Sequence, residues 1–163
     1  MLEKARLFAL EAHAEQKYGD QPYIVHLEAV VAHLHAYSDE AKIVGYLHDV
    51  VEDTNVSVTD IENSFGLFIA ECVAIVTDEP GTNRRERKQK TYAKMAKVSG
   101  KTQLALVVKA ADRLANLDAC VANNNTNKLL MYKSEHPAFQ QAVYRQGLCD
   151  DLWLKIDDII KIQ

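Results

Sequence analysis

The sequence has no long apolar run and little glycine or proline. Nothing approaches the ~18 consecutive apolar residues of a membrane span, and charges at Glu3, Lys4 and Arg6 occupy the place where a signal peptide needs an apolar core. We therefore expect a cytoplasmic protein that makes no membrane contact. Six glycines and three prolines in 163 residues do not indicate disorder. One domain over residues 1–163, with a full hydrophobic core, is the default for this length.

Cysteines are few, and the chain has no excess of basic residues. Cys72, Cys120 and Cys149 are odd in number, far apart and set in apolar contexts, which argues against a disulfide framework or a thiolate zinc site. We interpret them as buried thiols. The net charge of −4 gives no general attraction to nucleic acid, so no nucleic-acid partner is expected and a polyanionic ligand needs a local basic patch.

Helical periodicity dominates, and no segment shows sustained strand alternation, so the predicted fold is all-α, a single helical bundle. Gly, Pro and capping residues suggest the boundaries of its elements. The sequence predicts a turn at 18–22 before a helix containing His26, helices over 40–51, 57–64 and 66–76, a loop at 78–83, a basic helix over 84–98, an apolar helix over 101–121, and two more helices to the C-terminus.

Four residues are candidate ligands of one divalent metal: His26, the adjacent pair His48 and Asp49, and Asp112. An isolated His-Asp pair is usually a histidine at a helix end beside a carboxylate. Here, however, the pair follows the apolar segment 43–47, and burying such groups without partners costs several kcal/mol each. Because a bound cation removes this cost, the pattern favours a metal site with open positions for water or substrate.

Two further carboxylates follow the His-Asp pair at helical spacing. Along a helix, Glu52 lies one turn beyond His48, and Asp53 one turn beyond Asp49. Both side chains are then placed where a metal-bound water binds. This arrangement is typical of metal-assisted hydrolysis.

Other histidines and aromatic residues are assigned structural roles. His13, His33, His35 and His136 are expected at the surface or in caps, so a single metal ion is predicted. Phe139, Tyr144 and Trp153 have periodic apolar neighbours. Core packing or a subunit contact is therefore expected for them, and a homo-oligomer is left open.

The candidate ligands resemble the H…HD…D signature of the HD-domain metal-dependent phosphohydrolases, an all-helical superfamily. Within it, the chain resembles the hydrolase domain of RelA/SpoT-type alarmone enzymes and the single-domain small alarmone hydrolases. The segments that carry this resemblance are Pro22 to His26, Leu47 to Thr54, Phe65-Gly66, Val76 to Asp78, and Val108 to Leu117.

The resemblance implies removal of the 3′-pyrophosphate of guanosine tetra- or pentaphosphate, the alarmones of the stringent response, by metal-activated water. One divalent ion, expected to be manganese, serves as cofactor, and a small nucleotide is the partner. Glu52 and Asp53 are then the catalytic pair that positions or deprotonates the attacking water.

The resemblance also suggests substrate contacts. Arg84 aligns with a phosphate-contacting lysine of the family, although the basic run that it begins is otherwise interpreted as a solvated helix face. Lys17 stands where the family often has an arginine, and Asp118 where relatives commonly have a basic residue. The remaining expected contacts are Tyr18, Asn116, Lys128 and Tyr132.

Two alternatives stay open at this point. The chain can be a phosphohydrolase of the same superfamily that acts on an adenosine alarmone, a nucleoside monophosphate or a phosphorylated dinucleotide such as NADPH, as one animal branch of the family does. It can also be a non-catalytic module that senses an alarmone or binds a partner. The presence of both Glu52 and Asp53 argues against the second alternative, because a pure binder has no need of them.

Overall fold

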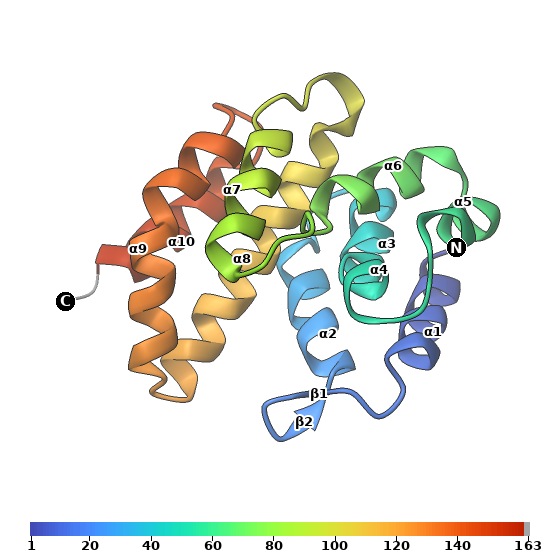
Figure 1. Ribbon diagram of the computed structural model, residues 1–163, viewed down its shortest axis with the longest axis horizontal. Helices are drawn as coiled ribbons and strands as arrows, with labels where there is room; N and C mark the ends of the chain where they lie inside the picture. Colours follow the sequence, from blue (N-terminus) through green and yellow to red (C-terminus); the bar gives the residue numbers. More distant parts are fainter. Residues whose placement is uncertain (162–163) are drawn as a thin grey trace.

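The computed structural model, which describes residues 1–161, confirms the all-α prediction (Figure 1). Its N-terminal elements are α1 (Leu2–His13), β1 (Lys17–Tyr18), β2 (Gln21–Pro22), α2 (Ile24–His33), α3 (Asp39–Leu47), α4 (Val50–Asp53), α5 (Val58–Phe65) and α6 (Leu67–Val76). The C-terminal elements are α7 (Arg84–Met95), the 3-10 helix η1 (Gly100–Gln103), α8 (Leu104–Ala122), α9 (Thr126–Val143) and α10 (Asp150–Lys161).

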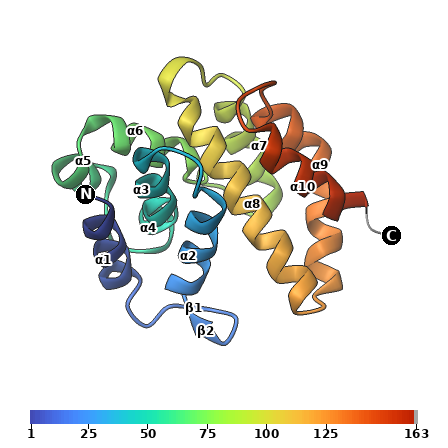
Figure 2. The same ribbon diagram turned by 180° about the vertical axis from the view of Figure 1, so that it is seen from behind.

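The long helix α8 runs through the middle of the molecule. It packs against α2, α3 and α6 on one side and against α9 and α10 on the other, as both views show (Figures 1 and 2). Nearly every residue from Ala105 to Leu117 is buried, because this helix faces other helices on most of its circumference. Polar residues on α8 are therefore placed at the centre of the fold.

The helix predicted over 40–51 is interrupted near its C-terminal end. Ser38 caps α3 as expected, with its hydroxyl accepting from the Ala41 N–H, but the regular helix stops at Leu47 and resumes only as α4. The Nδ1 of His48 donates to the Gly45 carbonyl oxygen at 2.8 Å. The side chain of His48 thus bonds to a backbone carbonyl oxygen of the last turn of α3, at the point where the regular helix ends.

The predicted boundaries elsewhere differ by a few residues. Ser57 begins α5 with a complete capping box, and Gly66, at a φ of +89°, separates α5 from α6 as expected. The basic helix ends at Met95 rather than at residue 98, and η1 replaces the first turn of the predicted apolar helix. The β1–β2 hairpin was not predicted, because strands of two residues are too short to show alternation.

The expected structural roles of the cysteines and C-terminal aromatic residues are borne out. All three cysteines are free and buried. Phe139 and Trp153 lie in the core, with ring centroids 5.4 Å apart, and Tyr144 packs edge-on against Trp153. Within residues 1–161, no helix is long and apolar enough to cross a membrane.

Gly45 gives a stability prediction with an unusual sign. A Cβ at this position would lie 2.9 Å from Cδ1 of Leu34 and 3.2 Å from Cγ2 of Val31, where α3 crosses α2. A helical Gly→Ala exchange normally stabilises by about 0.5–1 kcal/mol, but overpacking a core costs about 1–3 kcal/mol. We expect Gly45→Ala to lower the free energy of unfolding in urea denaturation. A more stable variant would show that Leu34 and Val31 move to accommodate the added methyl group at little cost in free energy.

Candidate metal centre and substrate cavities

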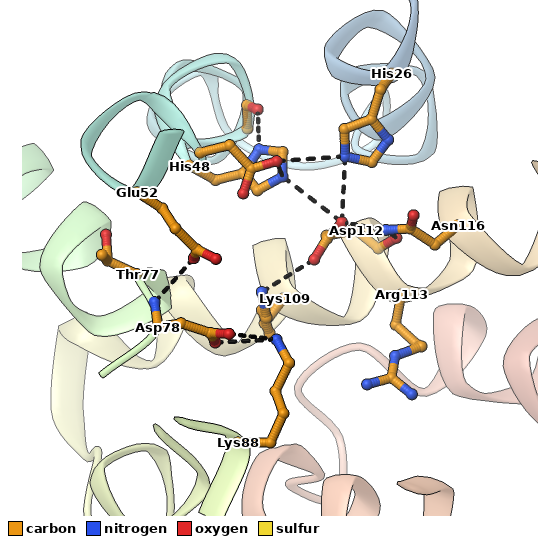
Figure 3. Close-up of polar contacts among 12 residues, drawn as sticks. His26, His48, Glu52, Thr77, Asp78, Lys88, Lys109, Asp112, Arg113 and Asn116 are labelled. Atoms are coloured by element: carbon orange, nitrogen blue, oxygen red, sulfur yellow. Dashed lines mark hydrogen bonds and ion pairs between the residues drawn. The ribbon is translucent and has the colours of Figure 1, made fainter. Parts of the chain in front are cut away.

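The four predicted metal ligands converge from three parts of the chain. Figure 3 shows His26, His48 and Asp112 pointing toward one another. His26 comes from α2, His48 and Asp49 from the interruption between α3 and α4, and Asp112 from the buried middle of α8. The Nε2 of His26 lies 3.6 Å from Asp49 Oδ2 and 3.3 Å from Asp112 Oδ1. The Nε2 of His48 lies 3.0 Å and 3.6 Å from the same two oxygens.

The donor set fits a divalent cation. Because Nδ1 of His48 donates to Gly45, Nε2 is the nitrogen that faces the carboxylates of Asp49 and Asp112, and in the neutral ring its lone pair is available to a metal. Burial opposes the protonated form of His48, yet the charges of Asp49 and Asp112 outweigh it and raise its pKa to about 10. These groups therefore favour a positive charge between them, which a metal ion supplies.

Each carboxylate ligand is oriented by a neighbour outside the cluster. Tyr23 donates its hydroxyl proton to Asp49 Oδ2 at 2.6 Å, and the amide of Asn116 donates to Asp112 Oδ1 at 2.6 Å. The buried Lys109 lies 3.0 Å from the other oxygen of Asp112 (Figure 3). Burial opposes the charged form of Lys109, but the Asp112 charge outweighs it and raises the pKa, so the ammonium stays charged. Such supports fix the direction of the ligands.

Glu52 is positioned by the segment after α6. Its Oε2 accepts from the backbone N–H of Asp78 at 3.0 Å, and the Asp78 carboxylate is paired with Lys88 at 2.7 Å (Figure 3). Burial in the cavity, together with the charge of Asp78, raises the pKa of Glu52. A carboxylate with a raised pKa is a stronger general base than an ordinary one.

Asp53 is positioned from the other side, by the segment after α1. The Nε2 of Gln16 donates to Asp53 Oδ2 at 2.9 Å, and Oε1 of Gln16 lies 2.9 Å from Nδ1 of His13. His13 is buried and stacks on Tyr23 with ring centroids 4.4 Å apart. The prediction of a surface or capping role for His13 is therefore wrong, because His13 supports the Gln16 side chain that holds Asp53.

The other discounted histidines lie away from the metal ligands. His33 pairs with Asp118, and His136 pairs with Asp157. His35 is exposed, with a ring nitrogen against the Ala32 carbonyl oxygen. Within residues 1–161, groups of three or more His, Cys, Asp or Glu side chains spaced to hold a metal occur only at this centre.

A cavity of about 200 Å³, here called the metal cavity, opens beside these residues. Five of the six predicted substrate contacts line it: Tyr18, Arg84, Asn116, Lys128 and Tyr132. Three unpredicted cations also line it: Lys88, Lys109 and Arg113. The carboxylates of Asp49, Glu52, Asp53 and Asp112 line the same cavity. With a divalent ion bound to the candidate ligands, the five cations would be the groups that face phosphate oxygens.

The unpredicted cations left only weak signals in the sequence. Lys109 and Arg113 flank Asp112 inside an apolar helix, and the presence of charged residues there was the available signal; the structure shows that both are buried. Lys88 was interpreted as part of a solvated helix face, but it points into the cavity, whereas its neighbour Arg85 is exposed. Since both lie on α7, only the packing of that helix decides which of them faces the site.

Arg84 and Arg113 share one carboxylate partner. Arg84 donates from Nε to Glu135 at 2.7 Å, and Arg113 lies 3.4 Å from the same residue. Arg113 is also buried against Phe139, with its guanidinium carbon 4.1 Å from the ring centroid. Glu135 thus fixes both guanidinium groups at the edge of the metal cavity.

A second cavity of about 850 Å³, here called the outer cavity, adjoins the first. Tyr18, His26 and Lys128 line both cavities, and Lys17, the sixth predicted substrate contact, lines the outer one. Asp118 also lines the outer cavity, with Oδ2 3.0 Å from Nε2 of His33.

The helical fold and the centre of two histidines and two carboxylates define the class of helical metal-dependent hydrolases. More particularly, the chain belongs to the HD-domain family: the family model described as "HD domain" matches residues 5–136. Hydrolases of this family bind a divalent metal, in agreement with the donor set found here. The family and the fold predicted from the sequence are thus confirmed.

Relatives of known name support this assignment. The chain is 31% identical over 163 residues to the Drosophila melanogaster "Guanosine-3′,5′-bis(diphosphate) 3′-pyrophosphohydrolase MESH1", covering 94% of this chain and 89% of that protein. It is 33% identical over 162 residues to the "Probable guanosine-3′,5′-bis(diphosphate) 3′-pyrophosphohydrolase" of a Synechocystis strain. That alignment covers 96% of this chain but spans only 21% of the larger relative.

A solved structure shows the same arrangement of helices. It is described as "A metazoan ortholog of SpoT hydrolyzes ppGpp and plays a role in starvation responses", and it matches with a TM-score of 0.79 at 25% sequence identity. The match covers 98% of this chain and 93% of the other. The fold is therefore shared along almost the whole length of both chains.

Proposed function

We propose that this chain is a metal-dependent pyrophosphohydrolase that removes the 3′-pyrophosphate of guanosine 3′,5′-bis(diphosphate) and its pentaphosphate counterpart. Its relatives are named for this activity, which supports the proposal. We further expect a cytoplasmic enzyme whose partner is its small nucleotide substrate rather than nucleic acid.

One observation carries the proposal: the metal ligands open directly onto a small cavity lined by cations. A volume of about 200 Å³ suits a diphosphate but not a whole nucleotide, while the adjoining 850 Å³ has room for a nucleoside. The arrangement favours a substrate whose phosphate chain reaches the metal and whose base remains outside the metal cavity.

The chain's own residues divide the catalytic work. His26, His48, Asp49 and Asp112 would hold a divalent ion, which would supply a Lewis acid toward a phosphoryl oxygen and acidify water. Glu52, fixed by the Asp78 N–H, then accepts the proton of the attacking water, and Asp53, fixed by Gln16, orients that water. Two oriented carboxylates at this position support turnover rather than simple binding.

Manganese is the metal we propose. Two imidazole nitrogens and two carboxylate oxygens form a mixed donor set that suits manganese, iron or zinc better than magnesium. Titrating the metal-free protein with each ion, and measuring turnover alongside binding, tests this choice. Higher turnover with zinc or iron than with manganese would contradict it.

The proposed substrate contacts fall into two groups. Arg84 and Lys128 are assigned to the phosphates, because both line the metal cavity. Tyr18 and Tyr132 are assigned to holding the cations beside the phosphates. The Tyr18 ring stacks on His26 and lies 5.1 Å from the Lys128 ammonium, and the Tyr132 ring centroid lies 4.6 Å from the Arg113 guanidinium. Lys17 is placed near the nucleoside, in the outer cavity. Asn116 lies in the metal cavity, where its side chain accepts from the Tyr18 hydroxyl and donates to the proposed metal ligand Asp112.

The first experiment measures pyrophosphate and phosphate separately. Purified protein with manganese is offered guanosine and adenosine 3′,5′-bis(diphosphates), a nucleoside monophosphate and a phosphorylated dinucleotide. Pyrophosphate release from the guanosine compound supports the proposal. Phosphate release from a monophosphate or a dinucleotide would instead assign the chain another activity of its superfamily, and binding without any turnover would favour a sensing module.

Lys128→Met tests the assignment of the phosphate contacts. Within residues 1–161, no carboxylate pairs with Lys128, so its ammonium is available to the substrate. We expect KM to rise about 10- to 100-fold, as lost charge-assisted hydrogen bonds contribute about 1.5–3 kcal/mol each, while kcat changes little. Lys133→Met, on the same helix but outside the lining of both cavities, is the control. An unchanged KM in steady-state kinetics would remove Lys128 from the site.

A further inference from the structure

We infer that Asp118, held by His33, selects guanine over adenine in the outer cavity. The inference rests on the proposed function and adds to it the chemistry by which the base is recognised. It concerns residues that stand apart from the metal ligands and from the catalytic carboxylates.

The outer cavity is bounded by small apolar residues from two packed helices. Val25 and Ala29 of α2 are four residues apart and share one helix face. Ala115, Ala119 and Ala122 of α8 are likewise spaced by four and three residues along one face. Since α2 and α8 pack against each other, these short side chains leave a space with apolar walls, which suits a flat aromatic base.

A charged pair connects the same two helices at this cavity. His33, at the C-terminal end of α2, lies with Nε2 3.0 Å from Oδ2 of Asp118 on α8. The second oxygen, Oδ1, has no hydrogen-bond or ion-pair partner in the described part of the chain. Asp118 therefore keeps acceptor capacity for a ligand, while His33 restricts where its carboxylate can lie.

The position of Asp118 relative to the metal suits contact with a base. Asp118 follows Asp112 by six residues on α8, which is a rise of roughly 9 Å along the axis and a rotation of roughly 240° around it. The two carboxylates therefore face different cavities, Asp112 the metal cavity and Asp118 the outer cavity. With the 3′-diphosphate at the metal, a base in the adjoining outer cavity lies beside Asp118, which lines that cavity.

Hydrogen-bond chemistry decides which purine this carboxylate accepts. An ionised carboxylate only accepts, and its two oxygens match the adjacent N1–H and exocyclic N2 amino donors of guanine. Adenine presents an acceptor at N1, whose lone pair faces the carboxylate without a proton between them. A site that hydrogen-bonds the donors of one ligand discriminates against an analogue that lacks them, because those hydrogen bonds are then not formed.

The decisive variant is Asp118→Asn. An asparagine offers one donor and one acceptor, which is the pattern that pairs with adenine. We expect kcat/KM for guanosine 3′,5′-bis(diphosphate) to fall about tenfold or more, and that for the adenosine counterpart to stay the same or rise. The inosine counterpart, which lacks the N2 amino group, should lie between them with the wild-type protein.

Asp20→Asn is the matched control. Asp20 is the other carboxylate that lines the outer cavity, and it lies on the exposed β1–β2 turn. The same exchange at this position should leave the ratio of guanosine to adenosine activity unchanged. An equal effect of Asp118→Asn on both substrates, or no effect, would overturn the inference.

Binding measurements separate this inference from the proposed function. Calorimetry with manganese and the Glu52→Gln variant compares the two nucleotides without turnover, in the presence and absence of Asp118→Asn. If the wild-type protein releases no pyrophosphate, the proposed function fails, and the binding preference still tests the role of Asp118. Equal affinity for both nucleotides in the Glu52→Gln protein would reject the inference by itself.

Discussion

Replacing Glu52 by glutamine is expected to reduce kcat for pyrophosphate release by at least about 100-fold, since general acid–base catalysis contributes about 10² to 10⁴ in rate. The amide keeps the size of the side chain, and its carbonyl oxygen can still accept from the Asp78 N–H. What the variant loses is the ability to accept a proton from water. Steady-state kinetics with saturating manganese measures the effect.

Metal binding distinguishes this explanation from a damaged metal centre. We expect Glu52→Gln to bind manganese with an affinity close to that of the wild-type protein, because Glu52 is not one of the four ligands. Glu62→Gln, the same exchange on the exposed surface of α5, serves as the control and should retain full turnover. Full activity of Glu52→Gln with metal bound would show that another group accepts the proton.

Replacing His48 by glutamine is expected to remove most of the metal affinity and, with it, the activity. His48 is 1% exposed, and its Nε2 lies between the two carboxylate ligands. Losing a group that merely supports a ligand costs about 10–100-fold in metal affinity, so losing the ligand itself should cost at least as much. Calorimetric titration with manganese measures the loss directly.

Thermal unfolding provides a second measure of the same variant. A metal that binds only the folded state raises the unfolding temperature, so wild-type protein should gain stability with manganese and His48→Gln should gain much less. His35→Gln is the control, because His35 is exposed and lies outside the centre. If His48→Gln showed the same metal-induced stabilisation as wild-type protein, His48 would not be a ligand.

The residues that position Asp53, Glu52 and Arg84 belong to segments far from them in the sequence. Asp53 is held from the segment after α1, Glu52 from the segment after α6, and Arg84 from α9. Small rearrangements of these segments would change the catalytic geometry without touching the metal. We therefore propose that the packing of these segments helps to set the positions of Asp53, Glu52 and Arg84.

The sequence by itself determined the helical fold, the types and identities of the expected metal ligands, and the carboxylate pair beside them. The helical periodicity and the spacing from His48 to Asp53 are local, because each is contained within a few turns. His26 and Asp112 lie on other helices, and the fold brings them to this segment. The resemblance of those segments to a known family was likewise present in the order of the motifs, and the match over residues 5–136 confirmed it.

Only the tertiary structure decided which polar residues complete the site and where the ambiguous ones point. Gln16 meets Asp53 across 37 residues of sequence, and Arg84 meets Glu135 across 51. The direction of Asp118, toward His33 and the outer cavity, depends in the same way on how α2 packs against α8. Such pairings are set by the packing of whole helices, so no local pattern of residues contains them.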